Sequence, residues 1–139
     1  MKTRQLLTLG VMALMVTTLG FAGHTVAVLD GTSWKIEAEP DDMAQKKGAQ
    51  QFKDVLVFAE GRISLRERGK SGVESGSYAV TSTVNDGKEH TFKAQLPTTA
   101  DGRWTWTGIV KGGNMEGKLI QTRLDGSVLT YTFKGNQLD

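Results

Sequence analysis

Hydrophobic and polar residues alternate along most of the chain from residue 33 onward. Trp34, Ile36 and Ala38, for example, are each separated by one polar residue. A period of two places successive side chains on opposite faces, which indicates half-buried β-strands. Glycine, asparagine and aspartate separate the alternating segments, as is typical of antiparallel hairpins. The pattern predicts eight strands, over 33–38, 56–58, 62–66, 77–84, 91–96, 104–106, 115–119 and 129–133.

Residues 39–48 break this period and predict one short helix. Pro40 is expected at the first helical position, acidic residues follow it, lysines end the segment and Gly48 lies beyond it. Proline loses no hydrogen bond at that position, and the charges complement the helix dipole. Glycine accepts the left-handed conformation that ends many helices. A second tract, 66–76, has no apolar periodicity and is expected to be a flexible loop.

Eight strands with one apolar face each need that face covered. One short helix is too little to cover an open sheet, and closing the sheet on itself also removes exposed strand edges. We therefore expect an all-β fold, an antiparallel up-and-down β-barrel of about eight strands with one short helix between strands one and two. A two-sheet sandwich is the alternative, but hairpin-length connections favour the barrel.

The first 27 residues have the features of a secretory signal peptide. Lys2 and Arg4 precede an uncharged apolar run, and small residues follow it. Cleavage is expected after Ala27, with Ala22 as the alternative. The apolar run is shorter than the roughly 20 residues of a membrane-spanning helix. These features predict a periplasmic or secreted protein with one domain over 28–139 and no stable membrane span after cleavage.

The charge of the mature chain argues against a nucleic-acid partner. The chain has 17 Lys and Arg and 15 Asp and Glu, and only Lys2 and Arg4 lie in the leader, so 15 of each remain. Nucleic-acid binding needs an excess of positive charge to replace counterions. There is no cysteine, so disulfides, thiol nucleophiles and thiolate metal sites are excluded. Nothing in the sequence indicates an oligomeric state.

The stretch "LDGTSWKIE", with Gly31 and Trp34, resembles the N-terminal motif of lipocalins and their calycin relatives. The usual lipocalin spacing has one residue between the glycine and the tryptophan, whereas this chain has two. The resemblance implies a barrel in which Trp34 closes one end. Lipocalins also commonly carry an arginine that packs on this tryptophan, and Arg123, which precedes the final strand, is the nearest candidate. The same stretch resembles, more weakly, the first strand of META-type periplasmic domains.

The inventory of reactive side chains favours a protein that is not an enzyme. His90 is the one histidine left after cleavage at Ala27, and it shares a strand face with Phe92, so a partly buried structural role is expected. Asp41 and Asp42 lie at the expected helix start, where the helix dipole explains them. We expect no metal and no cofactor.

The aromatic residues leave two functions open. Eight aromatic residues lie on the predicted inward faces of the strands: Trp34, Phe58, Tyr78, Phe92, Trp104, Trp106, Tyr131 and Phe133. One hypothesis is a module that binds a small apolar or amphipathic ligand inside the barrel, under the helix, with contacts from Trp104, Trp106, Tyr131, Phe92 and Tyr78. In that case Trp104 is expected to lie deep, with Trp106 or Tyr131 near one mouth. The other is a filled barrel that acts as a structural or protein-interaction module of the cell envelope, because eight aromatic groups would fill much of so narrow a barrel.

Overall fold

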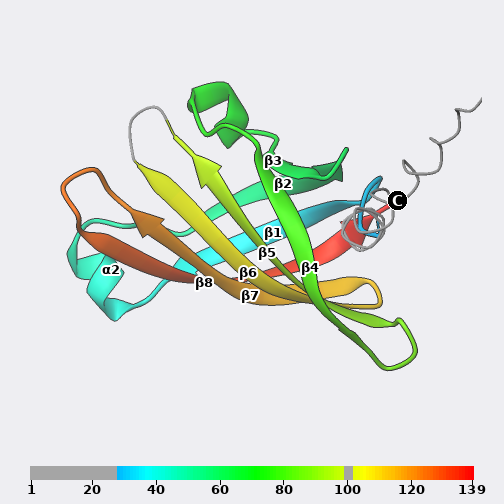
Figure 1. Cartoon of the computed structure of the whole chain (residues 1–139). Helices are drawn as coiled ribbons and strands as arrows, with labels where there is room; N and C mark the ends of the chain where they lie inside the picture. The colour runs from blue at the N-terminus through cyan, green and yellow to red at the C-terminus, as the bar shows by residue number, and fades with distance from the viewer. Residues whose placement is uncertain (1–27, 99–101) are drawn as a thin grey trace, which may run out of the picture.

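The computed structural model describes residues 28–98 and 102–139, and these ranges form one β-barrel (Figure 1). The predicted signal peptide lies outside the described residues. The eight strands of the barrel are β1 (Ser33–Pro40), β2 (Phe52–Ala59), β3 (Arg62–Leu65), β4 (Gly76–Val84), β5 (Glu89–Pro97), β6 (Arg103–Lys111), β7 (Asn114–Thr122) and β8 (Val128–Leu138).

The sheet is closed and every strand pair in it is antiparallel, so the expected architecture is confirmed. The strands are neighbours in chain order, and β1 pairs with β8 from Ser33↔Leu138 to Pro40↔Tyr131. The contact between β3 and β4 is the shortest of the eight, with Arg62↔Ser77 and Ile63↔Gly76 as its two residue pairs. Closure hides the inward face of each strand and leaves neither β1 nor β8 as an unpaired edge.

The helix between the first two strands forms, but it is shorter than the sequence predicts. It is α2 (Asp42–Lys46), and its N-cap is Asp41, whose carboxylate accepts a hydrogen bond from the Ala44 N–H at 2.8 Å. The prediction that Pro40 occupies the first helical position is wrong. Pro40 is the last residue of β1, where it pairs with Tyr131, so the strand continues up to the cap.

The tract 66–76, which the sequence predicts to be a flexible loop, contains regular structure. It contains the 3-10 helix η2 (Arg68–Ser71), and Val73 behind it is buried and bridges to Thr98. Val73 is the one apolar residue of this tract that is buried, so no hydrophobic period in the sequence predicts its burial. Val84 has the strand parity of Tyr78 and Val80, which predicts an inward side chain, but it is 50% exposed. A register shift between Val80 and Ser82 interrupts the alternation of β4, and a bulge of this kind changes which face later residues occupy.

Two ends of the barrel can now be named by their residues. At the α2 end lie α2, the start of β2 at Phe52 and the tract with η2. At the Trp34 end lie the turn 28–32, the start of β1 at Trp34, and the β4–β5 and β6–β7 hairpins (Figure 1).

Candidate functional site

The five aromatic residues predicted to contact a ligand all lie in the core. Each is at most 6% exposed: Tyr78, Phe92, Trp104, Trp106 and Tyr131. All five are in edge-on or tilted contact with other core rings; for instance, the ring centroids of Phe58 and Phe92 are 5.2 Å apart at 89°. Their inward placement follows strand parity, as the sequence analysis expects. Their role as ligand contacts stays a prediction.

One layer of cross-strand neighbours shows how tightly the interior is filled. It combines three aromatic and three small side chains, in the order Phe92, Gly108, Gly117, Phe133, Ala38 and Phe52. A Cβ at Gly108 would lie 2.6 Å from Phe92 Cε1, and one at Gly117 would lie 2.9 Å from Phe133 Cζ. The rings therefore occupy the volume that side chains on β6 and β7 would otherwise need, and this layer is closed to a ligand.

The order of the two tryptophans on β6 is the reverse of the expected one. Trp106 is completely buried, whereas Trp104, opposite Gln121, lies nearer the α2 end. Tyr131 lies beside this end, as expected. The Nε1 atoms of both indoles are buried and have no hydrogen-bond partner among the described residues. An unpaired buried donor costs about 1–3 kcal/mol, but burying roughly 150–250 Å² of aromatic surface at about 25 cal/mol/Å² contributes about 4–6 kcal/mol. For each indole, the free energy gained by burying the ring therefore exceeds the cost of the unpaired N–H group.

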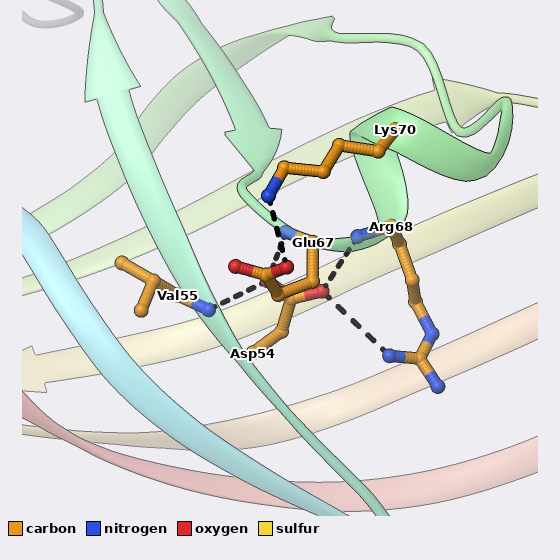
Figure 2. Close-up of polar contacts among 5 residues, drawn as sticks. All are labelled: Asp54, Val55, Glu67, Arg68 and Lys70. Carbon is orange, nitrogen blue, oxygen red and sulfur yellow. Dashed lines mark hydrogen bonds and ion pairs between the residues drawn. The ribbon is translucent and has the colours of Figure 1, made fainter.

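A polar cluster that the sequence analysis missed closes the α2 end (Figure 2). The Asp54 side chain points inward from β2 and is fully buried. Its carboxylate accepts hydrogen bonds from the backbone N–H groups of Val55 at 2.7 Å, Glu67 at 2.8 Å and Arg68 at 3.0 Å. These contacts attach the η2 tract to β2 beyond the point where β3 ends. Asp54 therefore adds to the backbone hydrogen bonds that hold this tract, from the Arg66 N–H to the Val55 carbonyl and from the Glu74 N–H to the Pro97 carbonyl, both at 2.9 Å.

Arg68 is the other half of this cluster. Its Nη1 lies 3.7 Å from Asp54 Oδ2, and its guanidinium carbon is 3.7 Å from the Phe52 ring centroid and 5.9 Å from that of Trp104. The side chain is 32% exposed, so it covers the aromatic core while its edge stays in contact with solvent. One signal for the cluster exists in the sequence: Asp54 shares inward parity with Leu56 and Phe58. Nothing local predicts that Arg68 is its partner.

The Trp34 end is closed by the turn that precedes β1. Trp34 is buried, and its Nε1 donates to Thr32 Oγ1 at 2.9 Å, while that hydroxyl donates to the Leu29 carbonyl at 2.7 Å. Gly31 has φ +91°, a conformation that favours glycine, and its N–H bonds the Phe58 carbonyl at 2.8 Å. The Arg123 prediction is wrong. Arg123 lies in the β7–β8 turn at the α2 end, because β7 runs away from Trp34.

Asp30 ties this turn to the far side of the barrel. The Tyr78 hydroxyl donates to Asp30 Oδ1 at 2.8 Å, and both Asp30 oxygens accept from the Gly61 N–H at 3.1 Å. Burial, and then the neighbouring Asp30 carboxylate, raise the pKa of the Tyr78 hydroxyl well above its usual range. Tyr78 therefore stays a neutral donor, and its ring packs on Phe58 with centroids 4.9 Å apart.

A hollow of about 670 Å³ opens beside this turn, and we call it the Trp34-end hollow. Its apolar floor consists of Leu29, Trp34 and Val110, all buried. Its rim combines the β4–β5 turn, the β6–β7 turn and the end of β8, with the following residues: Thr32, Asn85, Gly87, Lys88, Glu89, His90, Lys111, Gly112 and Gln137. Other hollows of about 510 to 540 Å³ lie elsewhere on the described part of the chain, and neither these nor the Trp34-end hollow is lined by any of the five predicted ligand residues.

The hollow brings together polar groups that can bind a small molecule. His90 is partly buried, as expected, and its Nδ1 lies 3.0 Å from Thr83 Oγ1. Over the described ranges, 28–98 and 102–139, no group of three or more His, Cys, Asp and Glu side chains could hold a metal ion. Within the same ranges, the helices are too short and too polar to span a bilayer.

The fold defines the class as a small, closed, eight-stranded, all-antiparallel up-and-down barrel without cysteine. This architecture is consistent with the lipocalin-like resemblance of its first strand. A comparison of the chain with protein-family models, curated proteins and solved structures finds no match.

Proposed function

We propose that the mature domain is an exported, non-enzymatic, lipocalin-like binding module for a small amphipathic molecule. In this proposal the ligand occupies the Trp34-end hollow and not the centre of the barrel. The leader-like first 27 residues support export, and the closed barrel is the architecture that the motif at Gly31 and Trp34 implies.

One observation carries this proposal, namely the hollow itself. Its volume of about 670 Å³ lies within the usual range of small-molecule sites, roughly 300–1,000 Å³. An apolar floor with a few polar groups at the rim is also typical of such sites. In the described part of the barrel, the layer at Gly108 and Gly117 offers no comparable space, since these glycines accommodate the rings of Phe92 and Phe133.

A neutral apolar dye, N-phenyl-1-naphthylamine, tests the proposal by fluorescence titration. We expect saturable binding with one site per chain. Gln137 is exposed on β8 and lines the hollow, so Gln137→Trp should fill the space and weaken binding at least about tenfold, or 1.4 kcal/mol. The matched control is Thr132→Trp, which adds the same side chain to the exposed outer face of the same strand and should bind like the wild type.

The packing of the interior favours a second candidate, a filled barrel that acts as a structural or interaction module through its outer surface. This candidate predicts no saturable dye binding by protein with a normal circular dichroism spectrum. Equal loss of binding in Gln137→Trp and Thr132→Trp would place the dye elsewhere and would also contradict the Trp34-end hollow.

A further inference from the structure

The rim of the Trp34-end hollow carries two lysines that have no charged partner. Lys88 lies in the turn between β4 and β5, and Lys111 is the last residue of β6. Among the described residues neither ammonium group forms an ion pair, since the three ion pairs present, Lys53–Glu37, Arg68–Asp54 and Lys70–Glu67, lie elsewhere. Both cations are therefore available to a molecule in the hollow.

Glu89, the acidic residue that lines the same rim, already forms a hydrogen bond within its own hairpin. Glu89 Oε2 accepts a hydrogen bond from Asn85 Nδ2 within the β4–β5 hairpin. Glu89 is the direct cross-strand neighbour of Lys111, yet their charged atoms do not come within ion-pair distance. The remaining titratable group at the rim, His90, adds a ring nitrogen that can donate but no negative charge. The residues that line the rim thus carry two positive charges, on Lys88 and Lys111, against the one negative charge of Glu89.

The floor has the opposite character. Leu29, Trp34 and Val110 present no charged group, and the one polar atom of Trp34 is already bonded to Thr32. An apolar floor under a cationic rim divides a bound molecule into two parts, a hydrocarbon or aromatic body below and a charged head above.

We propose that the occupant of the hollow is a small amphipathic anion. Its carboxylate, sulfate or phosphate head would lie between Lys88 and Lys111, and its apolar body would cover the floor at Trp34. This inference rests on the proposed function, because it names the ligand class of the same hollow. It places the discrimination between ligands at the turns of two hairpins, where none of the five aromatic residues singled out by the sequence lines the hollow.

Three amphiphiles with the same chain test the head group: decyl sulfate, decan-1-ol and decyltrimethylammonium, each titrated below its micelle-forming concentration by isothermal titration calorimetry. We expect decyl sulfate to bind at least about tenfold more tightly than the cation, because two ammonium groups attract one head and repel the other. This preference should shrink when salt rises from about 50 to 500 mM, since the lysines are near solvent.

Charge removal identifies the residues. The double variant Lys88→Gln, Lys111→Gln should reduce the preference to within about threefold, or roughly half of the 1.4 kcal/mol that a tenfold difference represents. The control is Lys93→Gln, Lys118→Gln, which removes the same net charge from exposed positions on β5 and β7 and should keep the preference. Loss of the preference in the control would assign it to overall charge and overturn the inference.

The outcomes separate the two proposals. Equal binding of all three amphiphiles by the wild type would overturn the anion inference but leave the binding module intact. Saturable binding of none of them, together with no dye binding, would remove both.

Discussion

The substitution Asp54→Ala is expected to lower the free energy of unfolding substantially. The fully buried carboxylate accepts three backbone hydrogen bonds, from Val55, Glu67 and Arg68, and faces the Arg68 guanidinium at 3.7 Å. Alanine removes every one of these acceptors. The N–H groups of Glu67 and Arg68 then lose their acceptor, and the hydrogen bond from the Arg66 N–H to the Val55 carbonyl is left to attach the tract to β2.

The magnitude follows from these contacts. Hydrogen bonds to a charged group contribute about 1.5–3 kcal/mol each, which sets an upper bound of roughly 4.5–9 kcal/mol for three. The N–H groups are only partly buried and water can replace some of the loss, and the pair with the one-third-exposed Arg68 adds little after screening. We expect Asp54→Ala to lower the free energy of unfolding by about 3–5 kcal/mol, the usual cost of breaking a buried pair.

A graded variant tests the reasoning further. Asp54→Asn can keep Oδ1, which accepts from Val55 and Glu67, and replaces Oδ2, which accepts from Arg68. Its cost should be about half that of alanine, roughly 1.5–3 kcal/mol, because one charge-assisted bond is lost and the others become neutral.

Urea unfolding followed by tryptophan fluorescence measures all of these changes. Glu67→Ala is the matched control, because it removes an acidic side chain from the same tract. The Glu67 side chain is 58% exposed, and its ion-pair partner Lys70 is 71% exposed. This substitution should change stability by no more than about 0.5 kcal/mol. A cost below about 1 kcal/mol for Asp54→Ala, or an equal cost for Glu67→Ala, would refute the reasoning.

Three further outcomes are expected. Trp34→Ala should cost about 3–5 kcal/mol in urea unfolding, as expected for an emptied aromatic site, and a loss below about 1 kcal/mol would contradict its burial. Gly117→Ala should lower the free energy of unfolding by at least about 1–3 kcal/mol or prevent folding, because its Cβ would lie 2.1 Å from the Thr107 carbonyl oxygen. The control Gly113→Ala, whose Cβ would have no atom within 4 Å, should be nearly neutral, and similar losses for the two variants would argue against close packing at Gly117. The intact mass of the exported protein should lack about 22 to 27 residues, whereas a full-length, membrane-integrated product would contradict the leader.

The sequence could predict those features that depend on local pattern. Alternation with a period of two predicts the strands and the inward face of Trp104 and Trp106, because parity is a property of each strand alone. The acids and lysines around residues 41–47 predict the helix, although not its first residue, since Pro40 fits a strand end as well as a helix start. Where a bulge enters β4, parity fails and Val84 lies outside the core.

The tertiary structure alone decides which distant residues meet. Asp54 and Arg68 are 14 residues apart, and Asp30 and Tyr78 are 48 apart, so no local period relates either pair. The Trp34-end hollow likewise combines the turn 28–32, two hairpins and the end of β8, which come together only when β1 pairs with β8. Local alternation determines which way a side chain points, but strand register and barrel closure determine what it contacts, because those contacts join segments that are far apart in the chain.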